Sequence, residues 1–388
     1  MKIIVIGGAG IQALGTIYDL LENDEVTEVM VADILIEKAE ERAKQIGDPR
    51  LTAKQINVLN EEETANVIKG FDVIINSGPA FLCPNVTRAA LKAGVNYVDL
   101  GAWPKETAEQ LELTEEFEAN GITAVLGMGS GPGISNMMAL AGVEQLDTVS
   151  DIDITIAMKD FTEYTSPLVT PYMLDTIIDE YTLNPVIVKD GEITKIDPLI
   201  SRPVEFKEPI GLANPVYTIH PEPVTLYDSF KDQGCKNTTF SIALPKEFHE
   251  KVEFLVQLGF GSKEPINMGG VEVSPRQALL TVVNQLIQPK VDKDQYSVTR
   301  VDVTGEKNGR KEKVVVEVYV GSEKKWNIPA GALKTSVPPS IVAQMLAKGQ
   351  VKRKGVYPPE KCIETAAFFK ELALRGMEVY SNKVEHTL

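Results

Sequence analysis

Residues 3–13 read Ile-Ile-Val-Ile-Gly-Gly-Ala-Gly-Ile-Gln-Ala, and this stretch decides the fold of the N-terminal part of the chain. The apolar run predicts a buried strand, and Gly8, Gly10 and Ala13 fall at the G-x-G-x-x-A spacing that opens a dinucleotide-binding βαβ unit. The first glycine allows a tight turn, the second lets the backbone approach a pyrophosphate, and the free N–H groups that follow attract the phosphates. The residues predicted to contact the dinucleotide here are Gly8, Ala9, Gly10, Ile11 and Gln12.

A carboxylate follows at the expected distance. Asp33 stands 20 residues after Ala13, at the predicted end of the second strand, where it would accept hydrogen bonds from the adenosine ribose. Its charge would repel a 2′-phosphate, and no arginine follows it before Arg42, so NAD is favoured over NADP as the cofactor. The alternative is that the glycines only form a turn and that Asp33 only caps the helix predicted over 34–46.

The N-terminal third of the chain alternates short β-branched runs with helical stretches, a pattern typical of a doubly wound parallel sheet. Strands are predicted at 3–6, 29–32, 55–58, 73–75, 97–100 and 122–126. Because ligands of open α/β sheets bind at the carboxyl ends of the strands, further cofactor contacts are expected there, although each of these residues could also belong to an ordinary turn. They are Asn57, Val58, Ser77, Gly78, Pro79, Leu100, Gly101, Met128 and Gly129.

A second domain of the α+β class is predicted from a change of pattern. From Asp151 polar and apolar residues alternate, as in a strand buried on one face. The segments 189–192 and 307–310 each place Asp-Gly or Asn-Gly between strand-like runs, which predicts antiparallel hairpins. Helices are expected again at 338–347 and 360–374. The predicted domains are therefore a Rossmann domain, 1–127 completed by 350–388, and an α+β domain with a mixed or antiparallel sheet, 128–349.

Composition excludes several classes of protein. The chain has 39 Lys and Arg against 55 Asp and Glu, a formal charge of −16 that would repel nucleic acid and anionic membranes. Its three cysteines, Cys83, Cys235 and Cys362, form no C-x-x-C pair, so neither a metal site nor a redox couple is expected. No apolar run is long enough for a signal sequence or a membrane span. We therefore expect a cytoplasmic protein that acts on a small molecule.

The G-x-G-x-x-A motif of residues 8–13, called the fingerprint below, is accompanied by the segments 76–79, 97–99, 127–133 and 355–360. In these stretches the chain resembles the saccharopine dehydrogenase family, including its lysine dehydrogenases. The match is loose between residues 151 and 334. The resemblance implies a Rossmann domain, a second domain for substrate binding and dimerisation, and a C-terminal segment that returns to the first domain. It also implies a homodimer that oxidises, or reductively forms, a C–N bond of a basic or substituted amino acid such as lysine or saccharopine. By the same likeness, Pro79, Gly101, Met128 and Gly129 would lie near the nicotinamide and its ribose.

Hydride transfer to or from an amine requires a base for its proton and anchors for the substrate. The candidates for catalysis are Asp99, which could instead be a turn residue, and His220 with Glu222, which follow a strand-like run. Arg202 and Arg276 are the candidates for binding a substrate carboxylate. Two other functions stay open: a homospermidine synthase-like enzyme that uses NAD transiently, and a regulatory protein that binds a dinucleotide without catalysis.

Overall fold

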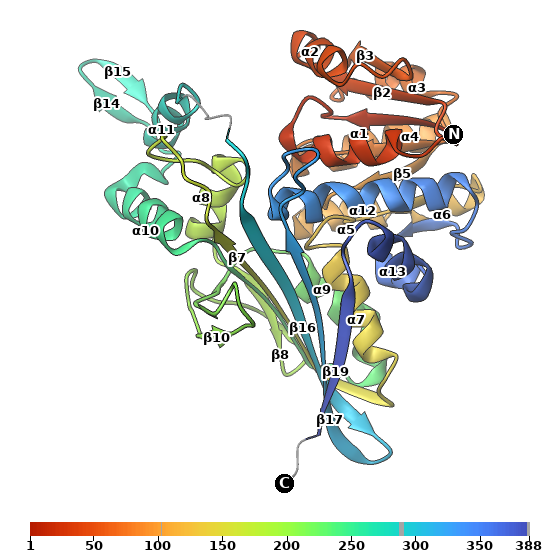
Figure 1. Ribbon diagram of the computed structural model, residues 1–388, viewed down its shortest axis with the longest axis vertical. Coiled ribbons are helices and arrows are strands. Elements are labelled where there is room, and N and C mark those ends of the chain that lie inside the picture. The colour runs from red at the N-terminus through yellow and green to blue at the C-terminus, as the bar shows by residue number, and fades with distance from the viewer. Residues whose placement is uncertain (102, 287–290, 386–388) are drawn as a thin grey trace.

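The protein is seen in a computed structural model that describes residues 1–101, 103–286 and 291–385, and it is built on two large β-sheets (Figure 1). The first sheet is parallel, with strand order β18-β6-β5-β4-β1-β2-β3, which is the Rossmann order with one added edge strand. Its strands are β1 (Lys2–Ile6), β2 (Glu28–Asp33), β3 (Leu51–Gln55), β4 (Val73–Asn76), β5 (Asn96–Asp99), β6 (Thr123–Val125) and β18 (Gly355–Tyr357).

Helices cover both faces of this sheet, because its strands are apolar on both sides. In β1, Ile3 and Val5 belong to one apolar cluster while Ile4 and Ile6 belong to another. The first face carries α1 (Leu14–Leu21), α2 (Ile36–Ile46) and α12 (Ala330–Ala347); the second carries α3 (Glu61–Ile68), α4 (Cys83–Ala93) and α6 (Thr114–Ala119). Helix α5 (Pro104–Leu111) packs on α4, and the short turns η1 (Ile11–Ala13) and η2 (Ala80–Leu82) follow β1 and β4.

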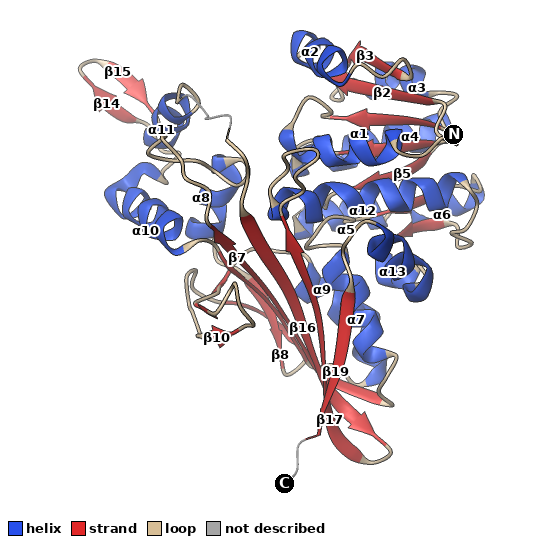
Figure 2. Cartoon of the chain, viewed as in Figure 1, coloured by secondary structure: helices blue, strands red, loops and turns tan. Residues whose placement is uncertain are grey.

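The second sheet is mixed and carries the other domain (Figure 2). Its strand order is β19-β17-β16-β7-β13-β8-β9, with β12 also pairing with β13; β13 runs parallel to β7, and the other pairs are antiparallel. The strands are β7 (Thr148–Asp160), β8 (Val186–Lys189), β9 (Glu192–Lys195), β12 (Val216–Tyr217), β13 (Asn237–Ala243), β16 (Gln295–Lys307), β17 (Arg310–Gly321) and β19 (Val379–Glu385).

The remaining elements surround this sheet. They are the helices α7 (Ile134–Val143), α8 (Leu174–Thr182), α9 (Glu222–Phe230), α10 (Lys246–Leu255), α11 (Pro275–Val283) and α13 (Thr365–Leu374); the ribbons β10 (Val204–Glu205) with β11 (Leu212–Ala213) and β14 (Ile266–Met268) with β15 (Val271–Val273); and the turns η3 (Lys231–Gln233), η4 (Val256–Phe260) and η5 (Pro359–Lys361). No helix in the described part of the chain is long and apolar enough to cross a membrane.

The predicted fold class is confirmed, and both predicted hairpins are present. Strands β8 and β9 pair around Asp190 and Gly191, and β16 and β17 pair around Asn308 and Gly309. All four turn residues have positive φ, between 51° and 83°, as expected of the tight turns that suit the twist of a hairpin.

Two predicted elements were wrong. The strand expected at 55–58 is β3, Leu51–Gln55, because this edge strand exposes most of its side chains and lacks the apolar run that marks a central strand. The helix expected from residue 338 begins at Ala330 and runs through Pro338 and Pro339. Prolines inside a helix remove two backbone hydrogen bonds, but α12 is buried along nearly its whole length, and its packing outweighs their loss.

The chain also crosses between the two sheets more often than the predicted domain limits allow. Strand β18 joins the first sheet, as expected of the segment 350–388, but β19 from the same segment forms the edge of the second sheet. Helix α12, placed by sequence in the second domain, packs against α1, β4 and β5 of the first. These crossings tie the two domains together.

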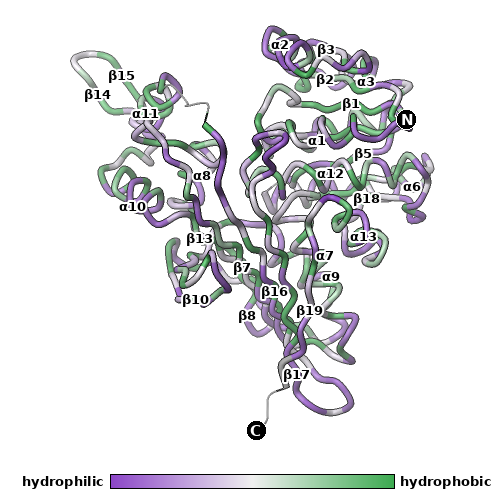
Figure 3. Tube along the Cα trace, in the orientation of Figure 1, coloured by the Kyte–Doolittle hydropathy of each residue, from purple (hydrophilic) through white to green (hydrophobic). Residues whose placement is uncertain are grey.

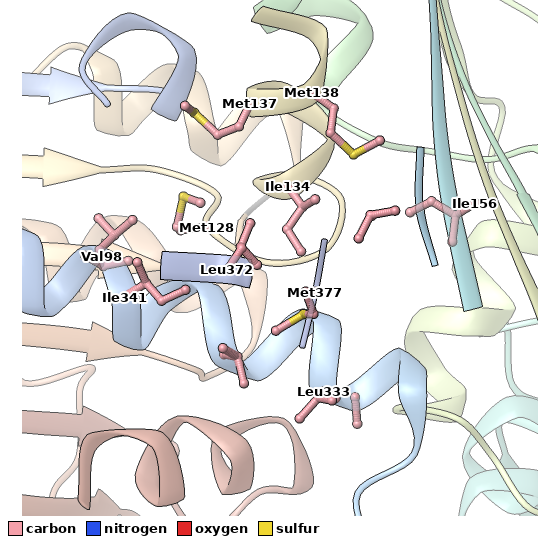
Figure 4. Close-up of a cluster of buried hydrophobic side chains, with 14 of the residues drawn as sticks. Val98, Met128, Ile134, Met137, Met138, Ile156, Leu333, Ile341, Leu372 and Met377 are labelled. Atoms are coloured by element: carbon pink, nitrogen blue, oxygen red, sulfur yellow. The ribbon is translucent and has the colours of Figure 1, made fainter. Parts of the chain in front are cut away.

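A single apolar core joins the two domains. Figure 4 shows Val98 of the first sheet, Ile156 of the second, and Met128, Ile134 and Leu333 between them. All five side chains are at most 6% exposed. Figure 3 shows the same contrast along the chain, with β1 apolar and the outer helix α2 largely hydrophilic. The relative position of the sheets is therefore set by close packing rather than by a linker.

Candidate active site

The loops that follow β1 and β4 pack backbone against backbone at the carboxyl edge of the first sheet. Gly7 has a φ of +69°, and a Cβ atom built there would stand 2.9 Å from the amide nitrogen of Gly78. A Cβ on Gly8 would stand 2.7 Å from a methyl group of Val31. Side chains are therefore excluded from this corner, which leaves its backbone open to a ligand.

Two polar atoms in these loops fit a dinucleotide. Among the residues that the structure describes, Gln12 Oε1 and Ser77 Oγ are buried and have no hydrogen-bond partner. Buried polar groups are usually paired, and a dinucleotide offers both hydroxyl donors and phosphate acceptors. The cradle of 7–12 and 77–79 thus matches the predicted cofactor site in both shape and chemistry.

Asp33 lies beside the fingerprint but also serves the fold. Its Oδ2 accepts a hydrogen bond from the Ala9 N–H at 3.2 Å, and its Oδ1 accepts one from the Leu35 N–H at 3.0 Å. Arg42 donates from Nη2 to the Ala9 carbonyl at 3.1 Å. The helix α2 therefore brings a guanidinium to the loop after β1, which the distance in sequence between Asp33 and Arg42 did not suggest.

The other predicted cofactor residues follow β3, β4, β5 and β6. Asn57 is exposed in the turn after β3, where its Oδ1 accepts from the Leu59 N–H, and Val58 is buried in the second apolar cluster. Met128 is fully buried, and its N–H donates to the Asp99 carbonyl at 2.7 Å. The loops that carry Ser77, Gly78, Pro79, Leu100, Gly101, Met128 and Gly129 all end on the same edge of the sheet.

Asp99 has a structural role, because its carboxylate accepts four hydrogen bonds from the chain itself. Its Oδ1 accepts from the backbone N–H groups of Gly101 and Gly127, at 3.0 and 2.6 Å, and its Oδ2 accepts from Tyr97 and Gln110 at 2.9 and 2.8 Å. Burial raises the pKa of the carboxyl, and these four bonds oppose that rise. The side chain is fully buried and joins the ends of β5 and β6, an arrangement that favours the turn role over proton transfer.

His220 and Glu222 form the pair expected from the sequence. His220 Nδ1 donates to Glu222 Oε2 at 2.9 Å, and the imidazole stacks on Phe240 with ring centroids 3.6 Å apart. Burial disfavours the charged imidazolium, but the charge and hydrogen bond of Glu222, with the charge of Glu180, outweigh it and raise the pKa of His220. Glu222 is fully buried, and its Oε1 accepts from Ser135 Oγ at 3.3 Å.

The sequence analysis missed two further buried carboxylates. The charge of Glu180 acts on His220, and Glu360 is linked to Glu222 only through the neighbouring residues Asn136 and Ser135. Glu180 on α8 accepts from the Tyr172 hydroxyl at 2.6 Å, and burial raises its pKa to about 7. Glu360 accepts from Asn136 Nδ2 at 2.9 Å and from Ser229 Oγ at 2.8 Å. The only signal for Glu360 was its place in the resemblance at 355–360, and Glu180 had no signal because acidic residues of helices are usually exposed.

These carboxylates have no lysine or arginine partner among the described residues. In the described part of the chain, no lysine or arginine forms an ion pair with Glu180, Glu222 or Glu360. Among the residues described, His220 is the only basic group that forms an ion pair or hydrogen bond with one of them. We call Glu180, His220, Glu222 and Glu360 the acidic cluster. Buried carboxylates without partners are costly, so the acidic cluster fits a cationic ligand.

The two predicted substrate arginines lie elsewhere. Arg276 is 4% exposed and is held by Asp175 at 2.6 Å and Asp179 at 2.7 Å. Arg202 pairs with Asp153 at the surface. Both are satisfied by aspartates of the chain, so neither is brought to the acidic cluster. Among the described residues, no group of three or more His, Cys, Asp or Glu side chains is arranged to hold a metal.

Two family models together match nearly the whole chain. The saccharopine dehydrogenase NADP-binding domain matches residues 3–125, and the saccharopine dehydrogenase C-terminal domain matches residues 129–377. The chain belongs to the saccharopine dehydrogenase family. The family resemblance is thus confirmed, with nucleotide binding by the first domain. The choice between NAD and NADP is not decided by these matches.

Individual members of the saccharopine dehydrogenase family are distant from this chain. It is 22% identical to a carboxyaminopropylagmatine dehydrogenase of Synechocystis sp., covering 97% of this chain and 96% of that protein. It is 21% identical to a carboxynorspermidine synthase of Vibrio alginolyticus, covering 99% and 98%. Among solved structures, apo saccharopine dehydrogenase (L-Glu forming) from Saccharomyces cerevisiae matches with a TM-score of 0.77, 17% identity and 99% coverage of both chains.

A homospermidine synthase from Legionella pneumophila in complex with NAD also shares the fold. The TM-score is 0.69 at 13% identity, with 100% of this chain and 92% of that chain covered. At such identities the structural matches establish the fold alone.

Proposed function

We propose that this protein is an NAD-dependent oxidoreductase that forms or oxidises the C–N bond of a substituted amino acid whose amine part is cationic. The observation that carries the proposal is the acidic cluster. Among the described residues none of its three buried carboxylates has a lysine or arginine partner, and only Glu222 is paired with His220, so an ammonium or guanidinium group would complement the other two. The names of the Synechocystis and Vibrio relatives, which contain agmatine and norspermidine, support a polyamine-like part. Lysine and saccharopine remain candidates within the same chemistry.

The chain's own residues would bind the amine and transfer a proton to or from its nitrogen. Bound NAD would supply or accept the hydride. Glu222 holds the His220 ring through Nδ1, which leaves Nε2 as the atom that would give or take a proton at the reacting nitrogen. Because the pKa of His220 is raised, the imidazolium is available as an acid for reductive C–N bond formation. Glu180 and Tyr172 would hold the far cationic end.

The test is a substrate panel followed in both directions. Purified protein would be assayed with NADH and NADPH on 1,3-diaminopropane, putrescine, agmatine or lysine, each with aspartate β-semialdehyde or 2-oxoglutarate, with products identified by mass spectrometry. We expect cofactor oxidation and a coupled secondary amine with at least one diamine. A coupled product without net change in cofactor would support the homospermidine synthase-like alternative. Tight cofactor binding without any product would support the regulatory alternative and contradict the proposal.

A further inference from the structure

Lys334 is a buried cation that the proposed chemistry has not used. It lies near the start of α12 and has no exposed surface. Its Nζ donates to Thr299 Oγ1 at 2.8 Å, and within the described residues this hydroxyl is its only hydrogen-bond partner. In the described part of the chain no carboxylate pairs with it, in contrast to the buried Arg276, which is held by Asp175 and Asp179.

The chain therefore leaves this amine without an anion. Burial alone lowers the pKa of Lys334 to about 7, with no acidic neighbour to oppose it. An ammonium has three donors, and Thr299 takes one of them. A ligand anion would satisfy the remaining donors and the charge, as buried charges require.

The position of Lys334 relates it to both parts of the candidate site. Thr335, the next residue, has its methyl group 3.5 Å from the place where a Cβ of Gly129 would stand, beside the predicted nicotinamide loop. Thr299 pairs across the sheet with Ile156, whose Cδ1 lies 3.0 Å from the Cβ position of Gly131.

Glu222 Oε1 lies 3.0 Å from that same Cβ position. The side chain of Ile156 thus stands between the lysine and the acidic cluster. Figure 4 shows Ile156 of β7 across from Leu333 of α12 at this junction of the two domains.

We propose that Lys334, with the Thr299 hydroxyl, binds the carboxylate of the substrate while the acidic cluster binds its amine. This inference rests on the proposed function and assigns the two ends of the substrate to two groups of opposite charge. Where the Lys334 side chain is neutral, substrate binding is accompanied by uptake of a proton, because the substrate carboxylate stabilises the ammonium form of this lysine. Since Lys334 is enclosed in the unliganded protein, its side chain or the contact between α12 and β16 must move when the substrate enters.

The kinetic test uses two aldehydes that differ only in the carboxylate, aspartate β-semialdehyde and 3-aminopropanal, each with 1,3-diaminopropane and reduced cofactor. Wild-type protein should prefer the carboxylated aldehyde in kcat/KM, and Lys334→Met should lose that preference, on the order of 10- to 100-fold, mainly through a higher KM. Lys334→Arg should restore part of it. Lys348→Met, at the residue that follows α12 and in an exposed ion pair with Glu25, is the matched control and should behave as wild type. The inference is overturned if the wild-type protein shows no preference between the aldehydes, or if Lys334→Met lowers kcat/KM equally for both.

A second measurement does not depend on turnover. The pKa of Lys334 would be followed by NMR of 13Cε-labelled lysine in protein saturated with cofactor, with and without L-aspartate as a non-reacting probe. We expect L-aspartate to raise this pKa by at least about one unit, and to bind Lys334→Met at least about tenfold more weakly. An unchanged pKa, or no L-aspartate binding, overturns the inference while leaving the proposed oxidoreductase function to its own assay.

Discussion

At the scale of single residues, the choice of cofactor depends on two side chains around Ala9. Asp33 contacts its N–H and Arg42 its carbonyl oxygen, so an acid and a base lie at the same end of the loop. A carboxylate there binds ribose hydroxyls and repels a 2′-phosphate, whereas a guanidinium binds the phosphate. We expect the acid to dominate in the native protein because it stands at the end of β2, where the ribose is expected to bind.

Asp33→Ser should therefore shift preference from NAD toward NADP by about 10- to 100-fold, since it removes charge-assisted hydrogen bonds and a repulsion. In that background Arg42→Ala should abolish the gain in NADP affinity, because the phosphate would lose its cation. Dissociation constants measured by fluorescence titration of NADH and NADPH give the result. If Asp33→Ser leaves both dissociation constants unchanged, the carboxylate only stabilises the local backbone and does not contact the cofactor.

His220 is the residue on which the proposed proton transfer depends. His220→Ala should lower kcat by about 10²- to 10⁴-fold, the range typical of losing a general acid or base. In the reductive direction, wild-type kcat should fall as pH rises through a pKa above 6.5, the ordinary value for histidine, because the imidazolium is then lost. His249→Ala is the matched control, since His249 lies on the outer helix α10 and contacts Tyr181 of α8. Equal activity of the two variants would contradict the assignment.

Glu180 should make stability depend on pH. Its folded-state pKa, about 7, lies above its ordinary value of 4.5, so ionisation destabilises the fold. The cost is absent below pH 4.5, grows between pH 4.5 and 7, and is complete above pH 7, where the shift corresponds to about 3 kcal/mol. Glu180→Gln should therefore raise the free energy of unfolding at pH 8 and leave it nearly unchanged at pH 4. Urea denaturation at both pH values tests this, and an equal effect at both would contradict the burial argument.

At the scale of elements, the crossing of α1 and α12 fixes the fingerprint helix against the second domain. A Cβ on Gly15 would stand 2.1 Å from Ser336 Oγ and 3.0 Å from its Cβ, and Thr16 donates at 2.5 Å to the Ser336 carbonyl. The close approach of the two backbones thus requires glycine, although the sequence motif stresses Ala13 instead. The helix expected to contact the phosphates is held by an element more than 300 residues away.

Gly15→Ala should destabilise the protein by about 1–3 kcal/mol, because the added methyl group forces the two helices apart. Gly321→Ala is the control, since its Cβ would meet only the Tyr296 ring at an ordinary distance of 3.6 Å. Thermal unfolding of both variants, with and without NADH, measures the difference. Comparable melting temperatures for the two variants would contradict the prediction, because they would show that α1 and α12 can move apart at little cost.

At the scale of the whole molecule, an apolar surface remains on the second domain. Its residues, each more than half exposed, are Phe254, Leu258, Ile266, Met268, Val271 and Val282. They belong to α10, η4, β14, β15 and α11, which lie together at the upper left of Figure 1 and include the apolar tip in Figure 3. Exposed apolar patches of this kind mark interaction surfaces, and we propose this one as the surface of the homodimer implied by the family resemblance.

The double variant Leu258→Asp with Met268→Asp should convert the proposed dimer to a monomer, because charges would be buried at the interface. Leu374→Asp, at an exposed leucine of α13, is the control and should leave the dimer intact. Light scattering coupled to gel filtration gives the masses. A monomeric wild type at micromolar concentration would contradict the proposal.

The sequence alone determined what depends on neighbours along the chain. The sequence features of this kind are the Gly8–Gln12 turn, the alternation of strands and helices in the first domain, the Asp190 and Asn308 hairpins, and the proximity of His220 to Glu222. Each arises from a few consecutive residues or from a periodicity. Local backbone geometry and the burial of alternate side chains are sufficient to specify such features.

Only the tertiary structure decided which distant groups meet. The contacts of Arg42 with Ala9, of Glu360 with Asn136 and of Lys334 with Thr299, and the effect of Glu180 on His220, join elements far apart in sequence. The same packing pairs Arg276 with Asp175 and lets Asp99 accept hydrogen bonds from the neighbouring loops. It also keeps α12 helical through two prolines. Charges and buried side chains act through space, so their partners are set by how the two sheets pack and leave no pattern in the order of the residues.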